Sequence, residues 1–320
     1  MATPEERATA TAAAAAAGTC TVDIVTLDSD EGVIRREDGL QIGQIESQSF
    51  GIGYQPRPGI TLLDSGSGPM IIPAENFVAA FRSEPGASAF GVATSASSAR
   101  LILQALEIGL DGVLLVTQSA SEVEELADFM IDSRTSDENI RLVAATVTAV
   151  TPTGMGDRAC VDTAAMLHPG DGMLVGSFAR GLVLVHCECL PHDFINSRPF
   201  RVNAGAVCSY ALSTRNTTQY LSELCTGASV HIVSKNGVCR TELCGRVKIE
   251  RRPLVRVDLN AEGTSFSVLL QHAETVMLIA EGGQPVSVCS LLPGACVLAH
   301  LPGVAARHAG IAIEETIVEL

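Results

Sequence analysis

The stretch GVLLVTQSASEVEELADFMIDS, residues 112–133, joins a short apolar run to a helical pattern. The same order occurs twice before it: GPMIIP leads into AENFVAAFRS, and ASAFGVAT leads into SASSARLILQALEIG. We expect this second helix to begin after a serine cap and to end at Gly109. Three successive strand–helix units predict parallel strands joined by right-handed crossovers. We therefore expect residues 19–140 to form an α/β domain that is partly barrel-like, with too few units for a complete eightfold barrel.

After residue 140 the sequence changes to strands and turns. The spacing Leu-x-x-Gly-x-x-apolar occurs three times, beginning at Leu167, Leu224 and Leu291, and each copy predicts a turn before a strand. The segment VHIVSKNGVCRTEL predicts a hairpin, because Asn236-Gly237 suits the positive φ angles of a type I′ turn. We expect residues 141–320 to form a mostly β domain.

Composition limits the kind of partner. The chain has 320 residues, a net charge of −15 and a pI near 4.8, which argues against a nucleic-acid or anionic membrane surface. A small anionic substrate would therefore need a local cluster of arginines. Residues 1–18 are predicted to be a disordered alanine-rich tail, and no run of 18 apolar residues indicates a membrane span. We expect a cytoplasmic protein, with plastid import conceivable for a longer native form, and the sequence leaves the oligomeric state open.

Two strand-like segments carry polar residues along one face. In RPFRVNAGAVCSY, residues 198–210, Arg201 and Asn203 alternate with apolar residues, and Arg198 precedes Pro199. In GRVKIERR, residues 245–252, the alternate positions carry a series of charged side chains: Arg246, Lys248, Glu250 and Arg252. A solvated outer face would explain this second pattern, although a purely solvated face has no need of one of only two lysines in the chain.

The segment GLVLVHCECL, residues 181–190, places His186 and Glu188 on the same face of a predicted strand. The pair suits general acid/base chemistry near neutral pH, and a structural pair at a sheet edge explains it equally well. Cys187 and Cys189 share the other face. They could ligate zinc, but no second cysteine pair completes a set of four ligands, so metal binding is the weaker interpretation and the metal stays unknown.

The segment TGMGDRACVD, residues 153–162, imitates a dinucleotide-binding turn. Gly154-x-Gly156 follows an apolar run, as in the glycine-rich motif that holds a pyrophosphate at a helix N-terminus. The match is weak, because no β/α/β frame surrounds it and Asp157 would bring negative charge toward the phosphates. The alternative is a polar turn that carries Asp157, Arg158 and Asp162 toward a site.

Long strings of the second half resemble one enzyme family. VTPTGMGDRACVDTAAMLHPGDGMLVGSFARGLVLVHCECL, SRPFRVNAGAV, YLSEL, GRVKIERRPL, LQHAETV and ARHAGIAIEETIVE are similar, in order and spacing, to the archaeal-type (type II) 3-dehydroquinate synthase family. Plant and algal members look closest, and 3-amino-4-hydroxybenzoate synthase is a sister branch. The resemblance covers residues 141–320, and more loosely residues 71–130 through IIPAEN and LEIGLDGVLL.

The resemblance implies an NAD-dependent enzyme of aromatic amino-acid biosynthesis in the shikimate pathway. Such an enzyme oxidatively deaminates 2-amino-3,7-dideoxy-threo-hept-6-ulosonate and cyclises it to 3-dehydroquinate. The sister branch implies a cyclase that needs a divalent metal and no net redox change. A relative that keeps the fold without catalysis is the third possibility.

The resemblance also suggests roles for the polar residues, since each reaction requires a clamped carboxylate near an amine and a carbonyl carbon. The candidates for substrate binding are Arg198, Arg201, Asn203 and Arg246. The candidates for proton transfer are His186, Glu188, Lys248 and Glu250. The candidates for cofactor binding are Gly154, Gly156, Asp157 and Asp162. The two aspartates could bind a metal or the nicotinamide ribose. The sequence departs from the family at Cys208, where relatives usually have histidine, a better proton-transfer group near neutral pH.

Overall fold

A computed structural model divides the chain into two compact units, Met1–Ser133 and Arg134–Leu320. The sequence places the boundary a few residues later, between residues 140 and 141. The structure describes residues 9–16, 19–28, 33–36, 41–46, 59–63, 71–82, 85–104, 109–135, 139–191, 195–213, 218–302, 306–308 and 311–313. No helix in these ranges is both long and apolar enough to cross a membrane.

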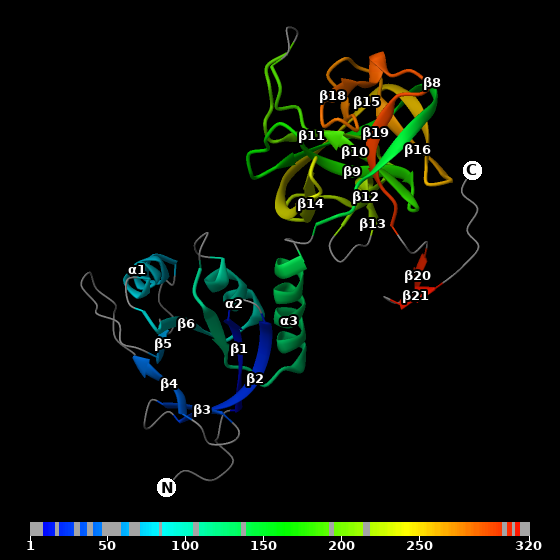
Figure 1. Cartoon of the computed structure of the whole chain (residues 1–320). Helices are drawn as coiled ribbons and strands as arrows, with labels where there is room; N and C mark the ends of the chain where they lie inside the picture. The colour runs from blue at the N-terminus through cyan, green and yellow to red at the C-terminus, as the bar shows by residue number, and fades with distance from the viewer. Residues whose placement is uncertain are drawn as a thin grey trace. The chain divides into compact units, whose positions relative to one another are not determined.

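The first unit contains a sheet whose strands follow one another in chain order (Figure 1). β1 (Thr9–Ala16), β2 (Thr19–Asp28), β3 (Val33–Arg36) and β4 (Gln41–Glu46) pair antiparallel. β4, β5 (Gly59–Leu63), β6 (Ala87–Ala93) and β7 (Gly112–Leu115) pair parallel, and β1 pairs with β7, which closes the sheet. The predicted parallel strand–helix units are confirmed for the second part of this sheet. β1 lies inside the segment predicted to be a disordered tail.

Three helices alternate with the parallel strands: α1 (Ile71–Phe81), α2 (Ala96–Leu103) and α3 (Ala120–Thr135). The prediction that GPMIIP forms a strand is wrong, because α1 begins at Ile71 and the preceding strand is β5. A proline is tolerated in the first turn of a helix, where its missing N–H has no intrahelical acceptor. The serine cap of α2 is confirmed at Ser95, whose side chain accepts from the Ser98 amide, but the helix ends at Leu103 rather than at Gly109.

The second unit is mostly antiparallel sheet, as the sequence predicts. Its strands are β8 (Val143–Thr163), β9 (Asp171–Phe178), β10 (Gly181–His186), β11 (Arg201–Ala206), β12 (Tyr210–Leu212), β13 (Thr218–Tyr220), β14 (Ser229–Ser234), β15 (Cys239–Ala261), β16 (Thr264–Gln271), β17 (Met277–Ile279), β18 (Pro285–Ser287) and β19 (Cys296–His300), which form one twelve-stranded sheet, with β20 (Ala306–His308) and β21 (Ile311–Ile313) as a separate pair.

The repeated Leu-x-x-Gly spacing corresponds to a repeated turn. Leu167, Leu224 and Leu291 are all buried in the core of the second unit. Their glycines have φ angles of +97°, +90° and +92°, a region that glycine enters without strain. Each turn thus places one leucine side chain in the core. The strands β9, β14 and β19 begin soon after the first, second and third turn.

The predicted hairpin is confirmed between β14 and β15, where Val233 pairs with Cys239. Its turn is not type I′, because only Gly237, and not Asn236, has a positive φ angle. The Gly237 amide donates to the Ser234 carbonyl, and the Ser234 amide donates to the Val238 carbonyl. The connection is therefore a three-residue loop closed by a left-handed glycine.

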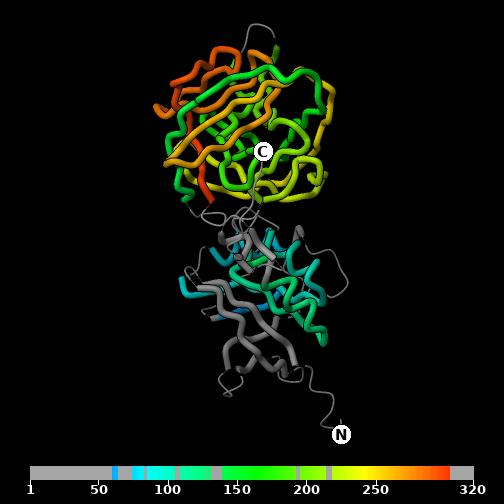
Figure 2. The backbone as a smooth tube through the Cα atoms, turned by 90° about the vertical axis from the view of Figure 1, so that its right-hand side faces the viewer, coloured from blue at the N-terminus to red at the C-terminus, as the bar shows by residue number. Residues whose placement is uncertain are grey.

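Two long strands dominate the second unit. β8 and β15 pair over most of their length, from Cys244 opposite Thr163 to Asn260 opposite Thr146, and they run side by side in Figure 2. β11 pairs with the other edge of β8 near its end. The three strands form a ribbon in the order β11, β8, β15, and this ribbon carries the candidate site.

Candidate active site

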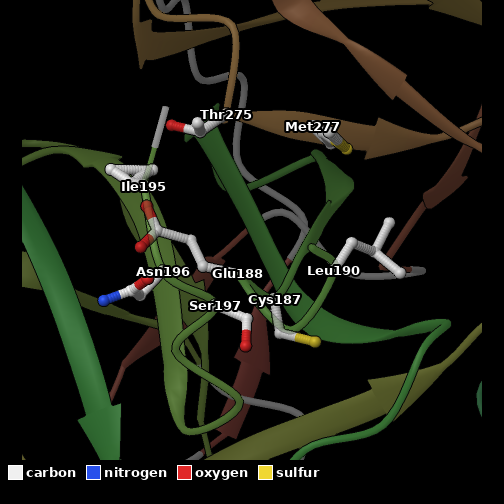
Figure 3. Close-up of a pocket in the computed structure, with 8 residues that line it drawn as sticks. All are labelled: Cys187, Glu188, Leu190, Ile195, Asn196, Ser197, Thr275 and Met277. Atoms are coloured by element: carbon white, nitrogen blue, oxygen red, sulfur yellow. The ribbon is translucent and has the colours of Figure 1, made fainter. Parts of the chain in front are cut away.

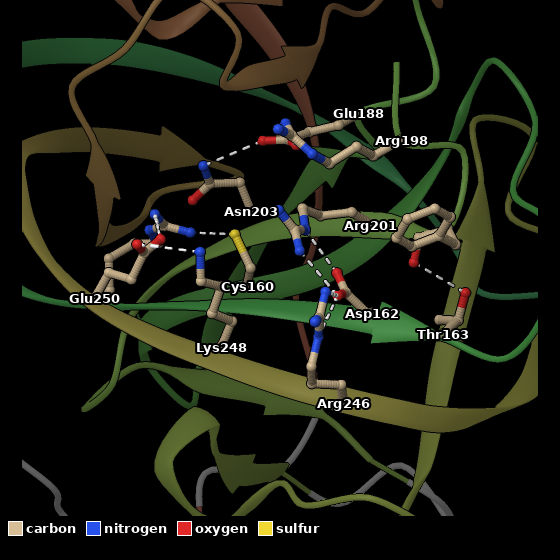
Figure 4. A network of polar contacts seen from close by, with 12 residues as sticks. Cys160, Asp162, Thr163, Glu188, Arg198, Arg201, Asn203, Arg246, Lys248 and Glu250 are labelled. Carbon is tan, nitrogen blue, oxygen red and sulfur yellow. Dashed lines mark hydrogen bonds and ion pairs between the residues drawn. The ribbon is translucent and has the colours of Figure 1, made fainter. Parts of the chain in front are cut away.

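Polar residues of three strands lie in rows across the ribbon. Asp162 of β8 is paired with Arg201 of β11 on one side and with Arg246 of β15 on the other. In the second row, two residues earlier along β8, Cys160 lies between Asn203 of β11 and Lys248 of β15. In the third row, a further two residues earlier, Arg158 lies opposite Glu250 of β15. Alternate residues of a strand share a face, so these rows form one polar surface, which Figure 4 shows. The predicted alternation of β11 and of GRVKIERR is confirmed.

Asp162 is the centre of the first row. Arg201 Nε donates to Asp162 Oδ1 at 2.6 Å and Arg201 Nη2 to Oδ2 at 2.9 Å, while Arg246 Nε donates to Oδ2 at 2.9 Å. Burial alone would raise the pKa of Asp162, but the hydrogen bonds from Arg201 and Arg246 outweigh it and hold the pKa below its usual value. The bond to Asp162 raises the pKa of Arg201. Asp162 therefore stays ionised and fixes both guanidinium groups.

The second and third rows combine a buried thiol with a charged pair. Arg158 Nη1 donates to Cys160 Sγ, and Arg158 Nη2 donates to Glu250 Oε2 at 3.0 Å. Burial raises the pKa of the Cys160 thiol to about 11, although the neighbouring Arg158 charge opposes this. Glu250 also pairs with Lys248 at 3.2 Å and with Arg252 at 2.9 Å. The hydrogen bond from Lys248 leads the causes that lower the pKa of Glu250.

A carboxylate from another segment joins the same face. Glu188 follows β10, and its Oε2 lies 3.3 Å from Arg198 Nη1. Asn203 Nδ2 donates to Glu188 Oε1 at 3.3 Å and to Gln271 Oε1 at 3.1 Å. These two acceptors fix the orientation of the Asn203 amide, and they leave its Oδ1 buried without a hydrogen-bond partner among the described residues. That oxygen is suited to accept a hydrogen bond from a ligand hydroxyl or amine.

The face carries an excess of positive charge in a strongly acidic protein. The three strands bring five basic side chains and two carboxylates to it: Arg158, Arg201, Arg246, Lys248 and Arg252, with Asp162 and Glu250. Glu188 and Arg198 add one charge of each sign. Arg246 and Lys248 remain 60% and 47% exposed, so they are open to a ligand. Arg201 is only 10% exposed. This arrangement, with accessible cations at the edge and a buried, fixed arginine beneath them, is suited to an anion.

His186 does not share the contacts of Glu188, although the sequence predicts that the two are neighbours on one face. β10 ends at His186, and the chain turns before Glu188 reaches Asn203. The Gly170 amide donates to His186 Nε2 at 3.0 Å, and His186 Nδ1 donates to the Cys187 carbonyl at 2.6 Å. Burial lowers the pKa of His186, so the ring is neutral at pH 7.

The residues predicted for a cofactor do not form a dinucleotide turn. Gly154, Gly156 and Asp157 lie within β8, which continues as a strand to Thr163, so no helix N-terminus follows them to hold a pyrophosphate. Asp157 is exposed and opposite Arg251, on the other face of the strand from Asp162. Asp162 is bound by two arginines and not placed for a ribose or a metal.

Sequence reasoning missed several members of the site. The sequence predicts a polar turn at Arg158 and indicates no role for Cys160 or Gln271. A strand pattern could have identified Arg158 and Cys160, because both alternate with Asp162 along β8. Gln271 is the last residue of β16, and no sequence pattern distinguishes it. Cys208 lies exposed in the turn after β11.

A pocket lies beside Glu188 (Figure 3). Its lining comes from the chain after β10, the segment before β11 and the start of β17: Cys187, Glu188, Leu190, Ile195, Asn196, Ser197, Thr275 and Met277. Glu188 therefore belongs both to this pocket and to the polar face.

Two family models match the chain. The model of the 3-dehydroquinate synthase II C-terminal domain matches residues 144–320, and that of the N-terminal domain matches residues 42–130. The chain belongs to the 3-dehydroquinate synthase II family. The predicted family is thereby confirmed, and the whole polar face lies in the part that corresponds to the family's C-terminal domain.

Individual proteins with similar sequences support the same family assignment. A 3-dehydroquinate synthase of Methanococcus maripaludis is 44% identical over 79% of this chain and 69% of its own length. Those of Methanothrix thermoacetophila and Methanocaldococcus jannaschii are 45% and 44% identical, over 81% and 78% of this chain and 70% and 68% of their own lengths. No solved structure matches the chain.

Proposed function

We propose that the chain is a 3-dehydroquinate synthase-type enzyme that converts 2-amino-3,7-dideoxy-threo-hept-6-ulosonate to 3-dehydroquinate on the polar face of β11, β8 and β15. The observation that carries the proposal is the net positive charge of this face in a chain of net charge −15. The proposed substrate is a small acid with several hydroxyl and carbonyl oxygens. The face offers cations for the carboxylate and a buried amide oxygen for a hydroxyl or amine.

Each residue has a distinct part in binding. Arg246 and Lys248, which are accessible, contact the carboxylate, and Asp162 holds the Arg246 guanidinium in a fixed orientation. Arg201 uses Nε and Nη2 for Asp162, so it acts on the ligand through its remaining Nη1 and through its charge. Asn203 Oδ1 accepts from a hydroxyl or the amine.

Glu188 is the base that the geometry favours. Its side chain is 9% exposed, it lies at the edge of a pocket, and Arg198 and Asn203 orient its two oxygens. A carboxylate so placed can take the proton needed for enolate formation and return one to an oxygen. Lys248 paired with Glu250 is the second candidate for proton transfer at the amine. The NAD requirement rests on the family resemblance, because Gly154 and Gly156 lie within a strand and form no dinucleotide-binding turn.

Steady-state kinetics with the amino heptulosonate and NAD test the proposal. We expect 3-dehydroquinate to form with reduced NAD, and Arg246→Gln to raise KM about tenfold or more, since a charge-assisted contact contributes about 1.5–3 kcal/mol. Arg256→Gln is the matched control, because Arg256 is an exposed arginine of the same strand that pairs with Asp258 outside the polar face. Equal kinetics for both variants would remove the face from the site. A metal-dependent aromatic product without reduced NAD would select the sister reaction, and binding without turnover would select a non-catalytic relative.

A further inference from the structure

One group of metal-ligating side chains occurs at the end of β10. Among the described residues, His186, Cys187 and Cys189 have ligand atoms that all lie within 4.8 Å of one another. His186 and Cys187 are buried and Cys189 is partly buried. The proposed function uses none of these three side chains.

Local structure explains why the three meet. β10 ends at His186, Cys187 makes an isolated bridge with Val202, and the chain then turns at Glu188 and Cys189. This turn brings the Cys189 thiol back to within 4.8 Å of the ligand atoms of His186 and Cys187. The Cys187 amide donates at 2.9 Å to the carbonyl of Asp171, the first residue of β9, and this anchors the segment beside the turn at residues 168–170 that precedes β9.

The same turn also contacts two of the three ligand side chains. Cys187 Sγ donates to the His168 carbonyl at 3.4 Å, and His186 Nε2 accepts from the Gly170 amide at 3.0 Å. The imidazole and the thiol are therefore held against one piece of backbone, which fixes their separation without a contribution from the polar face.

The spacing is close to that of a tetrahedral metal site. Zinc–sulfur bonds of about 2.3 Å and zinc–nitrogen bonds of about 2.0–2.1 Å place neighbouring ligand atoms about 3.5–3.8 Å apart. Ligand atoms within 4.8 Å reach this spacing when side chains move by about 1 Å, without a change of the strand.

The histidine tautomer also suits a metal ligand. The Gly170 amide can only donate, so Nε2 carries the lone pair and Nδ1 carries the proton that is given to the Cys187 carbonyl at 2.6 Å. A backbone carbonyl that accepts from the outer ring nitrogen is the usual orienting partner of a metal-bound histidine. A metal at Nε2 would replace the single bond from Gly170.

We propose that His186, Cys187 and Cys189 bind one zinc ion, with the fourth coordination position open to the pocket that Cys187 and Glu188 line (Figure 3). One nitrogen and two sulfur donors select zinc over magnesium or manganese, which prefer oxygen ligands. Binding releases the two thiol protons to solvent, and two thiolates with one Zn²⁺ leave a neutral centre, which suits a buried position. Three protein ligands with one open position characterise zinc sites that bind water or a substrate oxygen.

Cobalt substitution tests this site without any measurement of activity. The reduced, metal-free full chain is titrated with Co²⁺ under anaerobic conditions, and zinc content is measured separately after equilibration with one equivalent of Zn²⁺ and desalting. We expect one metal ion per chain and a sulfur-to-cobalt charge-transfer band. We expect both to be lost in Cys187→Ser and in Cys189→Ser.

Cys239→Ser is the matched control, because Cys239 is a buried cysteine whose Sγ lies 2.8 Å from His231 Nδ1 in a separate cysteine–histidine contact. It should retain the ion and the band. Cys189 is only partly buried, so Cys189→Ser decides the question even where Cys187→Ser does not fold. The proposal is overturned by a wild-type chain that binds no stoichiometric metal, by a band that survives both substitutions, or by a Cys187–Cys189 disulfide in place of metal binding.

Discussion

Asp162→Asn is the substitution that probes the organisation of the polar face most directly. The Asp162 side chain is 7% exposed, and both of its oxygens accept hydrogen bonds from Arg201, whose side chain is 10% exposed. An asparagine keeps the shape but directs an NH₂ group at a guanidinium, and it leaves a buried cation unpaired. Removal of one partner of a buried ion pair costs about 3–5 kcal/mol. Arg246 adds little to this value, because it is largely exposed.

We therefore expect Asp162→Asn to lower the free energy of unfolding by about 3 kcal/mol, measured by urea denaturation followed by circular dichroism. Asp157→Asn is the control, since Asp157 is exposed on the opposite face of the same strand and should change stability by less than about 0.5 kcal/mol. Asp162→Asn combined with Arg201→Gln removes both charges and should lose less than the two single changes together. If Asp162→Asn unfolds at the same urea concentration as Asp157→Asn, the ion pair does not organise the face.

The pH dependence gives an independent check on the same residue. The pKa of Asp162 is lowered in the folded chain, so its contribution to stability is fully present above the usual value of 3.8 and is lost as the pH falls through the folded pKa. The difference in stability between the wild type and Asp162→Asn should therefore be constant near neutrality and shrink below pH 3.8. A difference that grows on acidification contradicts the assigned charge state.

Two further predictions concern the ribbon that carries the site. Gly205 has a φ angle of +134°, and a Cβ there would lie 2.5 Å from a backbone carbonyl, so Gly205→Ala should destabilise the chain by about 1–3 kcal/mol in the same urea assay, whereas Gly282→Ala, with open space at its Cβ, should not. Cys160 should react with iodoacetamide far more slowly than the exposed Cys225, because Cys160 is buried and its pKa is raised to about 11. Peptide mapping after timed alkylation measures the two rates, and equal rates would show that Cys160 is not enclosed.

The sequence predicts which residues share a face, because alternation is a local property of a strand. It places Arg201 with Asn203, and Arg246 with Lys248, and the pairing of the strands confirms both. It does not predict that the end of β8 lies between them. The register between segments 40 to 90 residues apart depends on the packing of the whole sheet, and no local pattern encodes it.

Two other predicted groupings show the same limit of local patterns. His186 and Glu188 satisfy the alternation rule, but the rule holds only while the strand continues, and β10 ends at His186. Gly154 and Gly156 imitate a phosphate-binding turn, yet a glycine pair has this function only when a helix follows, and here β8 continues. In both cases the meaning of the pattern depends on the next element of the chain.

Stability alone does not account for the polar face. Arg158 and Arg201 are almost fully buried, and well-packed apolar residues in place of a buried ion pair are often equally or more stabilising. Asn203 Oδ1 and Arg158 Nε are buried without hydrogen-bond partners among the described residues, and each such group costs about 1–3 kcal/mol. A structural ion network would be expected to satisfy these atoms. The anionic, hydroxyl-bearing ligand proposed above would supply a donor for Asn203 Oδ1 and an acceptor for Arg158 Nε.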